Sequence, residues 1–292
     1  MTSEPKTDQL RPRRSVLYMP GANERALEKA KGLDADALIL DLEDAVAPDA
    51  KPEARERVCA AVQSDEYGHR ELTIRVNGIG TEWHEDDLAA AAQAGPHGVV
   101  VPKVNSADEV RALIDALEKA GAPDHTMLWA MVETPVAILH AEEIAAAHER
   151  LAVLVMGTND LVNETFAMHV PGRAPLVPSL TIALLAARAA GKAILDGVYN
   201  DVMNEEGFAA EARQGREMGF DGKTLIHPGQ VAGANAAFAP SEQAVADARG
   251  VLEAWENRTS GVVTFGGRMI EHLHVESASR TLRIHDEIVA RG

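Results

Sequence analysis

Eight short runs of apolar and β-branched residues alternate with alanine-rich amphipathic segments along this chain of 292 residues. This alternation is typical of β-α units, in which each strand is followed by a helix that returns the chain to the same end of a parallel sheet. Eight such units fit an α/β fold, either a (β/α)₈ TIM barrel or a doubly wound open sheet. The predicted strands are Ser15–Pro20, Ala37–Asp44, Glu71–Asn77, Gly98–Val104, Met127–Glu133, Leu151–Gly157, Ala193–Tyr199 and Asp221–His227.

Polar or small residues follow each predicted strand, and their distribution favours the barrel. Enzymes with this fold place their sites at the rim formed by the C-terminal ends of the strands. In an open sheet the outer strand ends lie too far apart to contribute to one crevice. We therefore predict a closed barrel. The rim residues are Pro20-Gly21, Asp41, Glu43, Asp44, Arg75, Asn77, Lys103, Glu133-Thr134, Gly157 to Asp160, Asp196 and His227-Pro228.

The pattern changes after residue 238. From there the sequence predicts a helix from about Ser241, a short strand near 261–265 and a final helix from about Ser277. Within the barrel domain, the connection 161–178 contains three prolines and is predicted to be a loop above the rim. The predicted organisation is a tail at 1–13, a barrel at 14–237 and a C-terminal α/β extension at 238–292.

The charge excludes several classes of partner. The chain carries 45 acidic against 28 basic residues, a net charge of −17. Such a field repels nucleic acid and anionic membranes, so neither is expected to bind. The single cysteine, Cys59, forms no intramolecular disulfide, and no uncharged apolar run approaches the ~18 residues of a membrane span. We expect a cytoplasmic protein.

Two carboxylates stand at the C-terminal ends of neighbouring predicted strands. Glu133 and Asp160 should project into the same space above the barrel, where they could hold one hard cation. Mg²⁺ takes few protein carboxylates and completes its octahedron with water and substrate oxygens. The sequence thus indicates a Mg²⁺ site, with Mn²⁺ as the alternative metal. The competing interpretation is that both acids only cap the helices that follow.

Arg75 lies at the end of the third predicted strand, where its planar guanidinium could bind the carboxylate of a small keto acid bidentately. The alternative is an ion pair with the acidic cluster Asp41, Glu43 and Asp44, and the two interpretations are compatible. The three acids repel one another, so a metal-bound water, a basic neighbour or a solvated loop must offset their charge.

Three other rim features have weaker implications. The turn formed by Gly157, Thr158 and Asn159 offers backbone N–H groups that could bind a substrate carboxylate. Lys103 lies at a strand end, where a class I aldolase could have the lysine that forms a Schiff base with its substrate. A metal ion at the site would make this covalent activation unnecessary. His227 is more typical of a packed rim residue than of a catalytic base.

Taken together, the motifs resemble the citrate lyase β-subunit-like acyl-CoA lyases of the HpcH/HpaI aldolase superfamily. That group includes malyl-CoA and citramalyl-CoA lyases and a malyl-CoA thioesterase. The resemblance extends over about residues 14–290, with the motifs in order. They are Arg14 to Gly21, Asp41-Leu42-Glu43-Asp44, Arg75-Val76-Asn77, Pro102-Lys103, Glu133-Thr134-Pro135, Gly157-Thr158-Asn159-Asp160 and Gly219 to Pro228.

The resemblance implies roles for particular residues and a quaternary structure. It implies Mg²⁺ on Glu133 and Asp160, the substrate carboxylate on Arg75, and metal-bound waters on the first acidic cluster. It also implies a homotrimer or hexamer in which the C-terminal segment of one subunit covers a neighbouring active site. Several relatives carry an aspartate there; Glu271 stands at that place in this chain and is a candidate catalytic residue.

The implied activity is that of a Mg²⁺-dependent lyase, which splits a 3-hydroxyacyl-CoA into an acyl-CoA and a 2-keto acid through a thioester enolate. Its partners would be the acyl-CoA and the keto acid, with Arg14, Tyr18 and Arg25 as candidate CoA-binding residues. An exposed basic helix face explains the arginines equally well. The alternative activity is hydrolysis of (3S)-malyl-CoA on the same scaffold, and a catalytically silent subunit of a larger complex is a third interpretation.

Overall fold

The computed structural model describes residues 11–258 and 262–291. The chain forms two compact units. One is Arg13–Phe238, and the other contains the described residues 11–12, 239–258 and 262–291.

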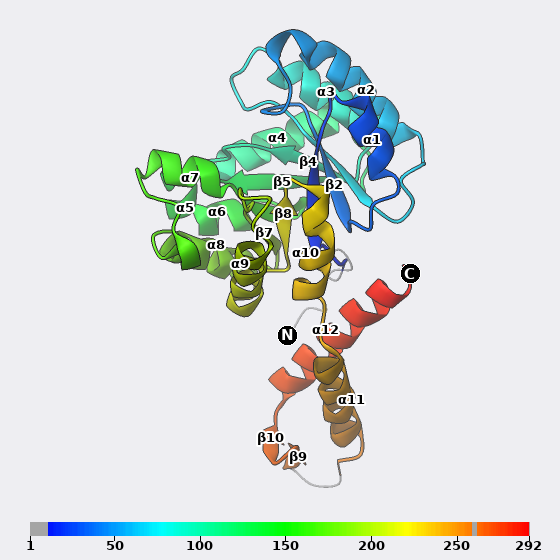
Figure 1. Ribbon diagram of the computed structural model, residues 1–292, viewed down its shortest axis with the longest axis vertical. Helices are drawn as coiled ribbons and strands as arrows, with labels where there is room; N and C mark the ends of the chain where they lie inside the picture. The colour runs from blue at the N-terminus through cyan, green and yellow to red at the C-terminus, as the bar shows by residue number, and fades with distance from the viewer. Residues whose placement is uncertain (1–10, 259–261, 292) are drawn as a thin grey trace. The chain divides into compact units, whose positions relative to one another are not determined.

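Within the described residues, eight parallel strands of the larger unit close into a barrel in the order of the chain (Figure 1). This confirms the predicted TIM barrel. Most of the predicted strands end one to three residues too late, because the polar rim residues leave the sheet to form the loops above it. The strands are β1 (Ser15–Pro20), β2 (Ala37–Asp41), β3 (Glu71–Arg75), β4 (Gly98–Val101), β5 (Met127–Val132), β6 (Leu151–Met156), β7 (Ala193–Asp196) and β8 (Gly222–Leu225).

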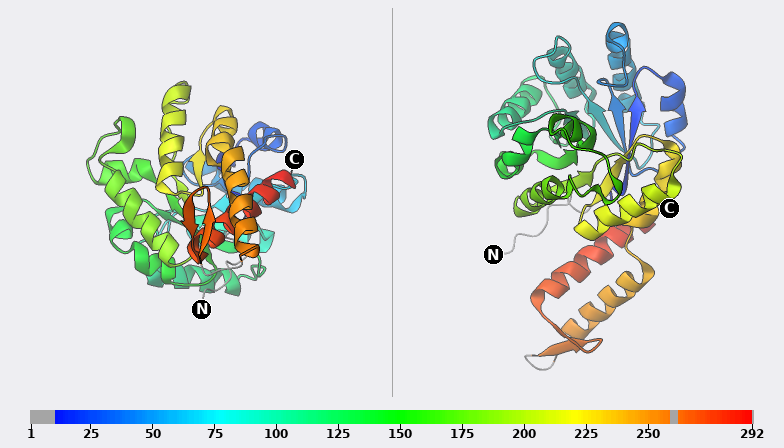
Figure 2. Two further views of the ribbon diagram at one scale, coloured as in Figure 1. Left: turned by 90° about the horizontal axis from the view of Figure 1, so that it is seen from below. Right: turned by 60° about the vertical axis from the view of Figure 1, so that its left-hand side comes forward.

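Helices surround the barrel, as the second view of Figure 2 shows. The predicted loop 161–178 is wrong in its extent, since a helix begins at Thr158 and another occupies its last residues. In the part of the chain that the structure describes, no helix has the length and apolarity to cross a bilayer. The helices are α1 (Glu24–Ala30), η2 (Pro48–Ala50), α2 (Lys51–Gln63), α3 (His84–Ala94), α4 (Ala107–Lys119), α5 (Pro135–Leu139), α6 (Ala141–Ala146), α7 (Thr158–Glu164), η3 (Pro171–Arg173), α8 (Val177–Ala189), α9 (Glu205–Met218), η4 (Pro228–Gln230) and α10 (Val231–Phe238).

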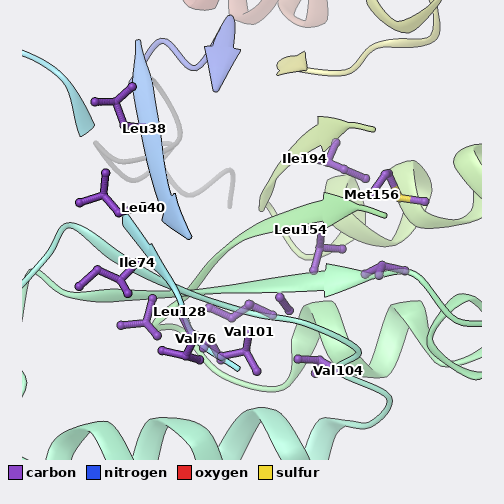
Figure 3. Close-up of a cluster of buried hydrophobic side chains, with 14 of the residues drawn as sticks. Leu38, Leu40, Ile74, Val76, Val101, Val104, Leu128, Leu154, Met156 and Ile194 are labelled. Atoms are coloured by element: carbon purple, nitrogen blue, oxygen red, sulfur yellow. The ribbon is translucent and has the colours of Figure 1, made fainter. Parts of the chain in front are cut away.

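Two hydrophobic clusters divide the strand residues between the two faces of the sheet. On β2, Leu38 and Leu40 belong to the cluster shared with the helices (Figure 3), whereas Ala37 and Ile39 belong to a smaller cluster inside the barrel. Successive side chains of a strand point to opposite faces, so this alternation places every second residue in the barrel interior. The same alternation decides which residues reach the rim cavity.

The smaller unit contains two helices and a two-stranded antiparallel sheet, α11 (Glu242–Glu256), β9 (Val263–Phe265), β10 (Arg268–Ile270) and α12 (His272–Val289). Strand β10 was not predicted, and α12 begins earlier than the expected Ser277. Gly266 and Gly267 join the strands with positive φ angles of 56° and 76°, which glycine adopts without steric cost. The expected strand start near residue 261 lies outside the described residues.

A buried ionic cluster links β7 and β8 to α9. Asp196 and Lys223 are both 0% exposed, and the Lys223 Nζ lies 3.0 Å from Asp196 Oδ2 and 2.8 Å from Glu211 Oε1. Arg173 donates to Asp196 Oδ1 at 2.6 Å. Burial alone would raise the pKa of Asp196, but Lys223 and Arg173 outweigh it and hold that pKa below its usual value.

Replacing Lys223 by Met should lower the free energy of unfolding by about 3–5 kcal/mol, because it removes one cation from a fully buried carboxylate. Urea unfolding followed by circular dichroism, at fixed protein concentration, measures the loss. The exposed Lys119 in the last turn of α4 provides the control. Lys119→Met should change stability by no more than about 0.5 kcal/mol.

The pH dependence tests the same cluster. Since the folded pKa of Asp196 is depressed, its contribution is complete above the unfolded value of about 4 and is lost as the pH falls below it. Lys223→Met raises that pKa toward or above the unfolded value, so the variant, although less stable at neutral pH, should lose less stability than the wild type when the pH falls below about 4. Identical acid profiles would show that Lys223 does not stabilise the ionised carboxylate.

Candidate active site

A cavity of about 290 Å³ opens at the C-terminal rim of the barrel. Several of its residues stand two positions beyond a residue of the inner cluster, so strand alternation turns them into the cavity. The lining residues are Tyr18, Asp41, Asp44, Ala45, Arg75, Met131, Glu133, Met156, Gly157, Thr158, Asn159, Asp160, Val198, Thr224 and Ile226. The rim residues predicted on β2, β3, β5 and β6 therefore meet in one space.

Arg75 is held by the acidic cluster of the β2 loop. Its Nε and Nη2 donate to Asp41 Oδ1 at 2.6 Å and Oδ2 at 2.8 Å. Its Nη1 lies 2.7 Å from Glu43 Oε2 and 3.4 Å from Asp44 Oδ2. Burial alone would lower the pKa of Arg75, but the bonds to Asp41 hold it well above the usual value. The ion pair considered in the sequence analysis is present, and it fixes a permanent cation at the cavity wall.

The aromatic ring of Tyr18 packs against the guanidinium group of Arg75. The Arg75 Cζ lies 4.8 Å from the ring centroid, a distance at which the guanidinium interacts with the π-face. Burial raises the pKa of Tyr18, so its hydroxyl stays protonated. Tyr18 therefore contributes a neutral, partly apolar wall beside the charged groups.

Glu133 directly follows β5, and Asp160 lies in the first turn of α7 after the neighbouring strand β6; both line the same cavity as Arg75. Glu133 is only 2% exposed, and its Oε1 accepts the backbone N–H of Lys103 at 2.9 Å. Burial, together with the charges of Asp160 and Glu43, raises the pKa of Glu133 to about 8. The negative charge of this carboxylate is thus poorly compensated by the protein itself.

This donor set fits a Mg²⁺ ion. Two carboxylates with hard oxygen atoms share the cavity, and a divalent cation would relieve the repulsion that raises the pKa of Glu133. Within residues 11–258 and 262–291, no group of three or more His, Cys, Asp or Glu side chains could hold a metal. A site with two protein carboxylates is compatible with Mg²⁺, because this ion keeps several of its waters.

The Gly157 turn differs in part from its prediction. The N–H of Gly157 donates to Val132 O at 3.2 Å, so it is not available to a substrate carboxylate. Thr158 and Asn159 begin α7, where backbone N–H groups have no partner inside the helix. The side chain of Asn159 exchanges two hydrogen bonds with Asn200, at 3.1 and 2.7 Å.

A buried lysine that the sequence analysis did not single out holds the acidic loop. The Lys51 Nζ donates to Leu42 O at 2.8 Å, to Glu43 O at 2.9 Å and to Asn77 Oδ1 at 2.6 Å. The side chain is 5% exposed. Because these bonds fix the backbone that carries Glu43, Lys51 also positions the groups around Arg75. No local pattern distinguishes such a lysine from an ordinary one at a helix start.

Not every predicted site residue reaches the cavity. Arg14 precedes β1, at the barrel end opposite the rim, and donates to Asp36 Oδ2 and Oδ1 at 2.8 and 2.9 Å. Its proposed contact with CoA is therefore wrong, since its position comes before the strand and not after it. Arg25 is exposed on α1, which follows β1 at the rim. Glu271 belongs to the smaller unit, where it is the N-cap of α12.

The fold and this cavity define a TIM-barrel protein whose rim combines a paired arginine with two carboxylates suited to a divalent cation. Comparison with known proteins gives the family. The chain belongs to the HpcH/HpaI aldolase/citrate lyase family, whose sequence profile matches residues 14–228. This confirms the resemblance seen in the motifs.

Several named proteins are similar to this chain over nearly its whole length. A (3S)-malyl-CoA thioesterase of Cereibacter sphaeroides is 47% identical over 97% of this chain and 98% of its own length. The citrate lyase subunit beta of Escherichia coli is 38% identical over 93% of both chains. An L-malyl-CoA/beta-methylmalyl-CoA lyase of Cereibacter sphaeroides is 34% identical over 96% of both chains.

Solved structures show the same fold. CitE from Mycobacterium tuberculosis in complex with magnesium, acetoacetate and coenzyme A matches with a TM-score of 0.77 and 31% identity, over 95% of this chain and 99% of that chain. The citrate lyase beta subunit of M. tuberculosis complexed with oxaloacetate and magnesium matches with a TM-score of 0.67 and 31% identity, over 80% of this chain and 100% of that chain.

Gly157 provides a test of where the Glu133 carboxylate must lie. A Cβ atom at residue 157 would stand 2.0 Å from Glu133 Oε2, so Gly157→Ala must displace that carboxylate. Misplacing a catalytic group by about 1 Å costs on the order of 100-fold in rate. Steady-state turnover of the purified variant should fall by at least that factor.

Gly78→Ala is the matched control, because its Cβ would lie 3.7 Å from Pro102 Cγ, an ordinary contact. This variant should keep most of the wild-type turnover. Circular dichroism and the unfolding midpoint establish that both variants fold. A folded Gly157→Ala enzyme with wild-type turnover would show that the position of Glu133 does not matter for the reaction.

Proposed function

We propose that this protein is a divalent-metal-dependent (3S)-malyl-CoA thioesterase. The observation that carries the proposal is the 47% identity, over 97% of the chain, to a protein of that name. The motifs resemble those of lyases that cleave a carbon–carbon bond, but the 47% identity to a thioesterase favours the alternative, hydrolysis of the thioester. The sequence motifs could not separate the two activities, because both require a site for a hydroxylated carboxylate joined to CoA.

The cavity supports the binding of such a substrate. Arg75 lines the cavity and supplies a fixed positive charge for the free carboxylate, and its Nη1 lies 3.4 Å from Oδ2 of Asp44, which also lines the cavity. Glu133 and Asp160 would hold the metal in the same cavity. When bound there, a divalent cation polarises an oxygen of the substrate and stabilises the negative charge that develops on it.

Hydrolysis then requires water at the thioester carbonyl. The bond between the carbonyl carbon and sulfur breaks, a carbon–oxygen bond to water forms, and CoA leaves as a thiol while malate is released. Glu43 can exchange the proton of the attacking water, since burial raises its pKa to about 7 and its carboxylate lies 2.7 Å from Nη1 of the cavity-lining Arg75.

Lyase activity is the second candidate function. The malyl-CoA/beta-methylmalyl-CoA lyase that is 34% identical to this chain favours it. The same residues would bind the substrate in both reactions. In the lyase reaction, the carbon–carbon bond then breaks to give glyoxylate and acetyl-CoA. Only the products distinguish the two.

The remaining site residues are assigned by position. Tyr18 forms the wall beside Arg75, and Arg25 is exposed on α1, where it could reach the phosphates of CoA. We further propose a homotrimer or hexamer in which Glu271 of one subunit completes the site of a neighbour. A carboxylate at that place could exchange a proton with the substrate carbon next to the thioester.

Incubation of the enzyme with (S)-malyl-CoA and Mg²⁺ in ¹⁸O-labelled water identifies the reaction. Direct hydrolysis should release free thiol and place one ¹⁸O atom in the malate carboxylate, without glyoxylate. Thiol assay, a carbonyl reagent for glyoxylate and mass spectrometry of malate measure the three products. Formation of glyoxylate and acetyl-CoA in place of labelled malate would make the protein a lyase.

Two variants connect the products to the cavity. Glu133→Gln and Asp160→Asn keep the size of the side chains but remove the charge that the metal needs, so both should lose at least about 100-fold in turnover. Full activity of either variant, or of enzyme dialysed exhaustively against EDTA, would contradict a metal at these residues.

Mixing inactive subunits tests the role of Glu271. If the site is shared between chains, Glu271→Ala and Asp160→Ala subunits should each be inactive alone and regain activity when mixed, because some sites then combine an intact barrel with an intact Glu271. Activity is measured after subunit exchange has been demonstrated by native mass spectrometry.

The control mixes Glu133→Gln with Asp160→Ala, which damage the same barrel site and should restore nothing. If exchange occurs and the first mixture also stays inactive, the site is not shared between chains. If Glu271→Ala is fully active alone, Glu271 is only the N-cap of α12.

A further inference from the structure

Lys103 has an unusual backbone conformation at the rim. It follows β4 with a φ angle of +52°, in the left-handed region that a lysine rarely adopts. In this conformation its N–H donates to Glu133 Oε1 at 2.9 Å. Strained backbone angles of this kind persist where the surrounding structure imposes them, and they cluster at functional sites. The local conformation thus serves to bind one of the two candidate metal ligands.

The side chain of the same residue reaches the other ligand. The Lys103 Nζ lies 2.9 Å from Asp160 Oδ1, and the two side chains are 49% and 36% exposed. One residue therefore contacts both carboxylates, Glu133 through its backbone and Asp160 through its ammonium group. The backbone contact is compatible with a bound cation, but the ammonium pairs with one of the two oxygens of Asp160 and places a positive charge beside the carboxylate that would bind the cation.

We propose that Lys103 sets the divalent-cation affinity of this site: its N–H positions Glu133, and its ammonium competes with the cation for Asp160. The inference rests on the proposed metal site. An ammonium and a divalent cation next to the same carboxylate also repel each other. The ion pair is half-exposed and therefore weak, so a divalent cation can displace the ammonium onto the open side of the rim.

The inference predicts a gain in affinity when the ammonium is removed. Lys103→Met keeps a similar side-chain length without the charge. Lys103→Gly also removes the charge, and it adopts the positive φ freely, so the N–H can still reach Glu133. Both variants should bind Mn²⁺ about three- to tenfold more tightly than the wild type. Titration of the free-Mn²⁺ electron paramagnetic resonance signal, without substrate, measures this directly.

Lys119→Met is the control for the change in net charge, since Lys119 lies exposed in the last turn of α4. Its Mn²⁺ affinity should equal that of the wild type. Lys103→Arg keeps a cation and should also stay close to the wild type. Circular dichroism verifies the fold of each variant, and the glycine variant provides a second reading if the methionine variant folds poorly.

The outcomes separate this inference from the proposed function. Loss of Mn²⁺ binding in Glu133→Gln with tighter binding in the two Lys103 variants supports both. Loss of binding in Glu133→Gln with unchanged or weaker binding in the Lys103 variants overturns the role of Lys103 and leaves the metal site standing. Wild-type Mn²⁺ binding in Glu133→Gln overturns the metal site itself, and the role of Lys103 with it.

Discussion

The two-residue alternation of strands in a closed barrel determines both the core and the candidate site. Along β5, Trp129 and Met131 face the interior, and Glu133 stands at the next inward position above them. Asp41 and Arg75 occupy the corresponding places at the ends of β2 and β3. A shift of one residue in any of these strands would turn its charged group into the apolar layer beneath the helices.

The alternation brings several carboxylates together at the rim, and the basic side chains of the protein neutralise only part of their negative charge. Arg75 offsets Asp41 through two hydrogen bonds, and the Lys103 ammonium pairs with Asp160. Glu133 is buried beside the charge of Asp160, and its pKa of about 8 shows the cost of ionising it there. A cation between the two carboxylates would make their ionised state favourable, and the same cation could then act on a substrate oxygen.

The sequence predicts the barrel and the gathering of Glu133, Asp160 and Arg75 because both follow from strand periodicity. Contacts that depend on loop geometry could not be predicted in this way. The N–H of Gly157 donates to a backbone carbonyl of β5 and is not available to a substrate. Lys51 donates to two backbone carbonyls of the acidic loop, a contact that no sequence pattern indicates. The assignment of Arg14 to CoA failed because its motif spans both ends of β1, and only the end after the strand lies at the rim.

The central claim is that Glu133 and Asp160 together bind one divalent cation, and crystals soaked in Mn²⁺ test it most directly. An anomalous difference map should show one peak in the rim cavity, about 2.0–2.2 Å from a carboxylate oxygen of each residue. Crystals of Glu133→Gln treated identically should lose that peak. A map of the wild type with no peak between the two carboxylates, or with Mn²⁺ bound elsewhere, would contradict the account.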